Sequence, residues 1–291
     1  MTGIRFGPSG NSDAFYRQGY KHTWQTPEWL HGLGLNAFEY SFGHGVRMKT
    51  ETAKRIGEEA LKYGVAMSAH APYYVNLAVD GAEEQDRNIR HVMEAVSAAR
   101  DMGAVRVVVH PGSVSRIGRA DGLELAKANL SHILGLKREL GFDDVVLCME
   151  TMGRHSQLGT VDEVLSLCAL DDALLPTLDF GHINARGRGS LTTQADYAAV
   201  FDAVKNALGA DRLQNAHIHF SRVEFSAAGE RRHWTLNDTQ YGPEFGPLAA
   251  ELAARDLTPV VICESRGTMA HDAAEMKRMY EDALAKMESG G

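Results

Sequence analysis

Short hydrophobic runs alternate along this chain with longer segments in which apolar positions recur every three or four residues. The short runs are rich in β-branched and aromatic residues, which is typical of buried strands. Eight such runs occur, at residues 4–9, 35–42, 65–70, 105–112, 145–151, 174–180, 215–221 and 259–265. The segments between them predict amphipathic helices that end at glycine, as in residues 52–64, 83–103 and 121–141.

This regular alternation of strand and helix predicts a parallel sheet. Eight units in 291 residues, with no compositional break or long linker, predict an α/β fold with one (β/α)8 TIM barrel domain over residues 1–291. An open doubly wound sheet is the alternative. We favour the barrel because no GxGxxG motif follows the first run, and because the runs are spread evenly rather than in two halves.

Composition and charge narrow the class of protein. Hydrophobic residues at 44% and charged residues at 23% are ordinary for a soluble globular domain. No apolar run approaches the length of a membrane span and the first residues lack the pattern of a signal peptide, so we expect a cytoplasmic protein with no membrane partner. A net charge of −8 gives no broad basic surface, so a nucleic-acid partner would require local arginine or bound metal ions.

Side chains that carry chemistry end seven of the eight runs. In a (β/α)8 barrel the carboxyl ends of the strands line the active site. The alternation within a strand supports this, because Val108 and His110 share one face of their run, as do Ile262 and Glu264. The candidates are Glu39, His70, His110, Glu150, Asp179 with His182, His217 with His219, and Glu264.

One histidine or glutamate at a strand end is usually only hydrogen-bonded or solvated. A ring of imidazoles and carboxylates at one barrel mouth is different, because holding it together unpaired would be costly and divalent metal ions compensate that cost. Mixed histidine and carboxylate ligation fits Zn2+, with Mn2+ or iron as alternatives. A single ion would leave several histidines unused, so the set predicts a multi-metal site suited to phosphodiester hydrolysis.

Six short stretches in this order and spacing resemble one family: HAPYYVNL, VVVHPGS, METMGRHSQLGT, LDFGHINA, HIHFS and CES. They are similar to endonuclease IV, the metal-dependent apurinic/apyrimidinic (AP) endonucleases of AP endonuclease family 2 on a xylose isomerase-like TIM barrel. The stretches FGHGVRMKTETAK and GERRH look closest to a divergent branch. The resemblance implies a DNA-repair hydrolase with two or three Zn2+ ions. It would bind double-stranded DNA and cleave the phosphodiester 5′ to an abasic site. A monomer is the default expectation.

The resemblance also implies roles for individual residues. It gives the metal ligands in three groups: His70, His110 and Glu150; Glu150, Asp179, His217 and Glu264; His182 and His233. Three carboxylates of this set, Glu150, Asp179 and Glu264, are the expected catalytic residues. Tyr73 and Tyr74 would bind substrate by replacing the stacking that disappears when the abasic nucleotide leaves the helix. They could instead pack under a loop.

The third group departs from the family pattern, which is an Asp, any residue and then a His. This chain reads Glu230-Arg231-Arg232-His233, with Arg231 where the Asp is expected. Either Glu230 replaces the Asp through a one-residue insertion, or the third site is altered or empty. His219 is a spare ligand that the pattern does not contain.

Two other functions stay open. A sugar isomerase or epimerase of the same barrel superfamily would need only the second group, holding a single Mn2+, and would leave His70, His110, His182 and His233 without a role. A metal-bound protein that binds damaged DNA without cutting it is the third possibility. The unused histidines lead us to favour the endonuclease.

Overall fold

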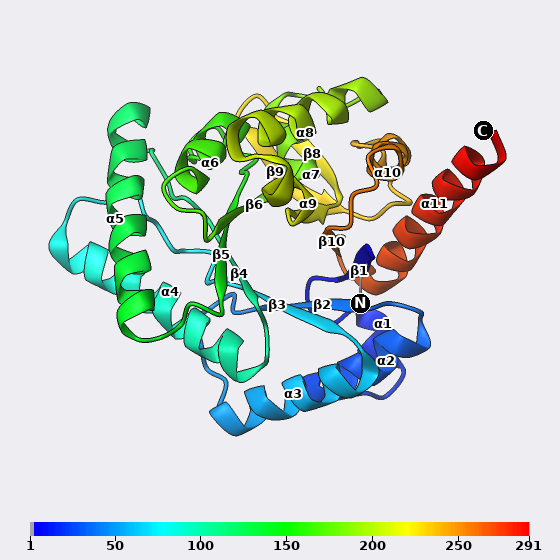
Figure 1. Cartoon of the computed structure of the whole chain (residues 1–291), viewed down its shortest axis with the longest axis horizontal. Coiled ribbons are helices and arrows are strands. Elements are labelled where there is room, and N and C mark those ends of the chain that lie inside the picture. Colours follow the sequence, from blue (N-terminus) through cyan, green and yellow to red (C-terminus); the bar gives the residue numbers. More distant parts are fainter. Residues whose placement is uncertain (1–2, 291) are drawn as a thin grey trace.

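The computed structural model describes residues 3–290. Its centre is a parallel sheet of eight strands: β1 (Arg5–Pro8), β2 (Ala37–Ser41), β3 (Ala66–His70), β4 (Arg106–Val109), β5 (Val146–Glu150), β6 (Leu174–Asp179), β7 (His217–Phe220) and β10 (Val260–Cys263). The strand order is β1-β10-β7-β6-β5-β4-β3-β2, and helices surround the strands (Figure 1). The predicted (β/α)8 barrel is confirmed, and each of the eight expected runs contains one of these strands.

The first two strands meet and close the barrel. Asn36 N–H donates to the Phe6 carbonyl at 3.1 Å, and Gly10 N–H donates to the Glu39 carbonyl at 2.9 Å. A Cβ atom at Gly7 would lie 1.8 Å from the Ala37 carbonyl oxygen, so only glycine permits this approach. The closure brings the carboxyl end of β2 beside the other strand ends.

The outer layer consists of amphipathic helices that connect the strands. The longer helices are α2 (Thr26–Gly32), α3 (Thr50–Tyr63), α4 (Ala82–Asp101), α5 (Arg119–Glu139), α6 (Val161–Cys168), α8 (Gln194–Leu208), α10 (Phe245–Ala254) and α11 (Met269–Gly290). In α4, Val92, Ala95 and Val96 are fully buried while charged residues occupy the opposite face. Among the described residues, none of the helices has both the length and the apolar character that a membrane crossing requires.

Several short elements interrupt the barrel pattern. They are α1 (Asp13–Arg17), the 3-10 turn η1 (Thr23–Gln25), α7 (Phe180–Arg186), α9 (Ala210–Gln214), and the antiparallel pair β8 (Arg222–Ser226) and β9 (Gly229–Trp234). The β8–β9 hairpin follows β7 directly and packs against α7 (Figure 1). It was not predicted. The SAAGE turn between two runs of alternating side chains was its signal in the sequence.

Candidate metal centre

The strand ends place histidines and carboxylates together at the mouth of the barrel. Four groups of side chains have ligand atoms that all lie within 4.8 Å of one another. They are His70 with His110 and Glu150; Glu150 with Asp179, His219 and Glu264; His182 with Glu230 and His233; and Glu39 with His217 and His219. Numbered in this order, the first and second groups share Glu150, and the second and fourth groups share His219. The third group shares no residue with the others and lies beside them.

The first group has the form expected of a metal site. His110 Nε2 lies 2.9 Å and His70 Nε2 lies 3.1 Å from Glu150 Oε2. The other ring nitrogens face backbone carbonyls, with His70 Nδ1 2.8 Å from Ala71 and His110 Nδ1 3.3 Å from Tyr73. A carbonyl can only accept, so each Nδ1 carries a proton, and each Nε2 would turn its lone pair to a bound ion once its own proton is released.

The third group contains Glu230 because of a β-bulge. In the hairpin Glu224 pairs with Arg232 while Phe225 pairs with Glu230, which leaves Arg231 as an extra residue in β9. Glu230 Oε2 lies 3.4 Å from His182 Nε2, and Arg231 points outward to an ion pair with Glu224. Of the two alternatives left open by the sequence, this geometry favours the one-residue insertion.

Both histidines of the third group are anchored like those of the first. His182 Nδ1 lies 3.0 Å from the Thr151 carbonyl, and His233 Nδ1 lies 2.8 Å from the Ser221 hydroxyl. The two Nε2 atoms face each other at 3.3 Å. Two imidazole nitrogens and a carboxylate thus converge on one point. Ser221 was not identified from the sequence, although it follows His219 at the spacing that places both residues on one side of the strand.

The second group contains His219 rather than the expected His217. Residue pairing between β6 and β7 sets Asp179 level with His219 and Thr177 level with His217. Successive inward residues of a parallel strand lie about 6–7 Å apart along it, so His217 sits one layer deeper in the barrel, beside Glu39. The residue that appeared to be a spare ligand therefore lies in the second group, with its Nδ1 3.1 Å from Glu150 Oε1.

The second group is buried and electrostatically unbalanced in a way that suits a cation. Burial raises the pKa of Asp179 to about 6, and its Oδ2 atom has no hydrogen-bond partner within the described chain. Burial also acts to raise the pKa of Glu150, but the charge and hydrogen bond of His110 outweigh it and hold that pKa well below its usual range. A buried carboxylate oxygen without a donor is costly unless a cation takes that position, so the residues fit divalent metal ions.

A cavity of about 310 Å3 opens over the first three groups, and the fourth group, with Glu39 and His217, lies below them. Tyr73 lies on its wall, and its side chain is 57% exposed. Tyr74 does not line this cavity and packs against the His91 ring, with centroids 5.1 Å apart. The structure therefore places one of the two expected substrate-binding tyrosines at the site and the other beside α4.

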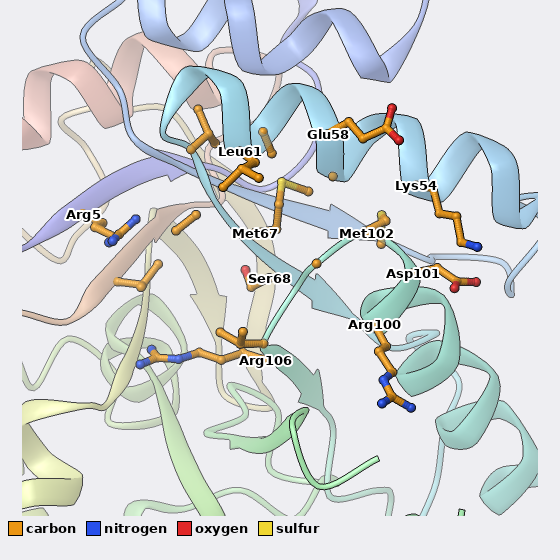
Figure 2. A pocket seen from close by; sticks show the side chains of 17 residues that line it. Arg5, Lys54, Glu58, Leu61, Met67, Ser68, Arg100, Asp101, Met102 and Arg106 are labelled. Carbon is orange, nitrogen blue, oxygen red and sulfur yellow. The ribbon is translucent and has the colours of Figure 1, made fainter. Parts of the chain in front are cut away.

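A second cavity, of about 640 Å3, lies at the opposite end of the barrel, where the strands begin. In Figure 2 Arg5 and Arg106 extend toward one side of it and Lys54 and Arg100 toward the other, with Ser68 between them. The charged groups do not converge on a common point. Among the described residues, the charged groups of this cavity therefore form no counterpart to the ligand groups at the mouth.

Sequence comparison identifies the family to which this arrangement belongs. The profile of the xylose isomerase-like TIM barrel family matches residues 27–288. The chain belongs to this family. An uncharacterized protein of Methanocaldococcus jannaschii is 33% identical over 255 residues, which cover 87% of this chain and 90% of that protein. A probable endonuclease 4 of Streptomyces coelicolor is 30% identical over 222 residues, covering 73% and 74% of the two chains. The predicted relationship to endonuclease IV is confirmed.

Several solved structures share the fold. A D-tagatose 3-epimerase-like protein superposes with a TM-score of 0.73 at 18% identity and covers 99% of both chains. Endonuclease IV from Thermus thermophilus superposes with a TM-score of 0.68 at 21% identity, covering 97% of this chain and 99% of the other. At these identities the likeness concerns the barrel only, and the choice between nuclease and sugar chemistry depends on the residues of the site.

Proposed function

We propose that the protein is a metal-dependent AP endonuclease that hydrolyses the phosphodiester 5′ to an abasic site in double-stranded DNA. The observation that carries this proposal is the complete third ligand group, in which the bulge at Arg231 turns Glu230 toward His182 and His233. A one-metal sugar enzyme would use the second group alone, and the first and third groups would then have no function.

The surface around the mouth also supports a polyanionic substrate. Two further cavities flank the central one, and the three together are lined by six exposed cationic residues: Lys21, Arg47, Lys49, Arg154, Arg232 and Arg266. In the described chain none of the six is in an ion pair with a carboxylate. Among residues 3–290, no Asp or Glu apart from Glu150, Glu230 and Glu264 lines these cavities. This concentrates positive potential at the mouth of a chain whose net charge is −8.

Each part of the site has a task in the proposed reaction. The exposed cations would hold the phosphates on either side of the cleavage point, and Tyr73 would stack in the gap left by the abasic nucleotide. The histidines, fixed by their ring N–H groups, and the carboxylates Glu150, Asp179 and Glu264 would hold two or three divalent ions, with Zn2+ the best fit. Such ions supply Lewis acidity that polarises a phosphodiester and activates water.

A sugar isomerase or epimerase is the second candidate, and one observation favours it. Glu150, Asp179, His219 and Glu264 form a self-sufficient set of four ligands for one ion, with one glutamate at the end of β5 and the other directly after β10. Glutamates in such positions can exchange a proton with a bound sugar.

The deciding experiment offers the purified, metal-loaded protein a duplex oligonucleotide with a single abasic site, before and after chelation. We expect a chelator-sensitive nick that leaves a 3′ hydroxyl. The same duplex without the abasic site is the matched control and should remain intact. Absence of cleavage by protein of verified metal content would contradict the endonuclease, and turnover of a ketose by that protein would establish the sugar enzyme instead.

A further inference from the structure

Glu39 is a fully buried carboxylate below the second ligand group. Its Oε2 atom accepts hydrogen bonds from the Ser68 hydroxyl at 2.9 Å and from His217 Nε2 at 2.9 Å. Its Oε1 atom lies 3.1 Å from His219 Nε2. The side chains of Glu39, His217 and His219 are all 0% exposed, so this contact takes place away from bulk water.

Within the described residues, the two facing atoms make no hydrogen bond to any other group. Neither Glu39 Oε1 nor His219 Nε2 has a well-aligned hydrogen-bond partner among residues 3–290, although they lie 3.1 Å apart. The opposite ring nitrogen, His219 Nδ1, faces Glu150 Oε1 and lies 3.5 Å from Glu264 Oε1. One edge of the ring thus faces the ligand group and the other faces Glu39.

We infer that Glu39 is the positioning residue of the metal centre, accepting the Nε2–H of His219 so that the Nδ1 lone pair points at the second ion. His217 is then not a ligand. Together with Ser68 it holds the Glu39 carboxylate in place. This inference rests on the proposed metal centre and goes beyond it, because it assigns a function to a layer of the barrel that contacts no substrate.

The anchoring of His219 differs from that of the other four histidines at the mouth. His70, His110 and His182 have backbone carbonyls as the nearest partners of their Nδ1 atoms, and His233 has the hydroxyl of Ser221. The nitrogen of His219 that faces away from the ligand group has a carboxylate as its nearest partner. A carboxylate partner fixes the tautomer and raises the basicity of the ligating nitrogen more than a neutral acceptor does. The second ion should therefore depend on Glu39 more than the other ions depend on any single supporting group.

The test compares Glu39→Gln with Thr177→Val. Thr177 is buried, lies level with His217 in the same layer, and its hydroxyl has no partner in the described structure, so its variant controls for any change in that layer. Each full-length protein is stripped, and Zn2+ is titrated in competition with a chromophoric chelator. We expect one of the bound ions to be about 10- to 100-fold weaker in Glu39→Gln and unchanged in Thr177→Val.

A second measurement does not depend on the folding of any variant. In wild-type protein with isotope-labelled histidine and saturating Zn2+, nuclear magnetic resonance should show His219 protonated at Nε2 and not at Nδ1. Protonation at Nδ1, or equal affinities in Glu39→Gln and wild type, would overturn the inference while leaving the endonuclease proposal intact. Conversely, a metal-loaded wild type with the expected tautomer that cannot cut abasic DNA would refute only the proposed function. A wild type that binds no Zn2+ would refute both.

Discussion

Glu230 and His233 project from the same face of β9 although they are three positions apart. In a regular strand, side chains three positions apart lie on opposite faces. The bulge at Arg231 adds one residue opposite Glu224 and restores the common face. Both side chains can then reach His182, at 3.4 Å for Glu230 and 3.3 Å for His233.

Removal of Arg231 should therefore leave the third group intact. Deletion shortens the spacing from three residues to two and abolishes the bulge, so Glu230 and His233 stay on one face. We expect full metal content in the deletion variant. Glu230→Gln should lose about one metal equivalent, because it removes a charged ligand. Metal analysis of the dialysed proteins decides the point, and loss of an ion from the deletion variant would show that the bulge does more than restore the common face.

The barrel could be predicted because its signal is repeated. Eight runs alternate with helices, and an error in one run leaves the others in place. The choice between His217 and His219 depended on a single stagger between β6 and β7, which no local pattern encodes. The sequence held one useful sign, since His219 is the later of the two inward residues and strand ends carry the site.

Long-range pairing explains the remaining gaps between sequence and structure. Glu230 became a defined member of the site only through its place opposite Phe225 in a hairpin that was not expected. Glu39 was a candidate at a strand end, but its partner His219 comes from β7, far along the sequence. The contact exists because β1 and β2 close the barrel at Gly7. Such contacts follow from the tertiary fold and not from composition or periodicity.

Replacement of Glu150 should affect the site more than any other single change, because Glu150 is shared by the first and second groups. We expect Glu150→Ala to nick abasic DNA at least about a hundredfold more slowly than wild type. Glu251→Gln is a suitable control, since Glu251 is also a buried glutamate but lies on α10, paired with Arg255. A near-normal rate for Glu150→Ala would refute the assignment of the metal ligands.

Chelation should lower thermal stability. Metal that binds only the folded chain stabilises it by about 4 kcal/mol at a free concentration a thousand times Kd, which corresponds to several degrees in Tm. Differential scanning calorimetry before and after metal removal measures the shift. The Glu150→Ala variant should show a smaller shift, and an unchanged Tm in verified metal-free wild type would contradict a preformed site.

The cationic residues beside the mouth should contribute to DNA affinity and not to the chemical step. We expect Arg47→Ala combined with Lys49→Ala to weaken binding of abasic duplex and to reduce the slope of log affinity against log salt by about 1 for each phosphate that the variant no longer neutralises. The nicking rate at saturating DNA should be unchanged. Lys62→Ala is the control, because Lys62 is exposed at the other end of α3 and pairs with Glu59. An unaltered salt slope in the double variant would argue against a polyanionic substrate.

Glu163 anchors the loop that follows β5 and should stabilise the fold in a pH-dependent way. Its carboxylate accepts the N–H groups of Gly159 at 2.8 Å and Thr160 at 2.9 Å and pairs with Arg119, which also binds the carbonyl of Gln157. Burial acts to raise the pKa of Glu163, but Arg119 and the two N–H groups outweigh burial and lower it. Gln157, held through Arg119, lines the central cavity.

Because the folded-state pKa of Glu163 is depressed, its contribution is present above the unfolded pKa of about 4.3 and disappears as pH falls through the folded value. We expect Glu163→Gln to reduce the free energy of unfolding by about 1–3 kcal/mol at pH 7, and the difference from wild type to shrink below about pH 4. Glu124→Gln should change it by less than about 1 kcal/mol, because Glu124 is exposed in its pair with Lys127. Urea denaturation at several pH values measures both. A difference that persists unchanged into acid would mean that Glu163 acts through shape and not through its charge.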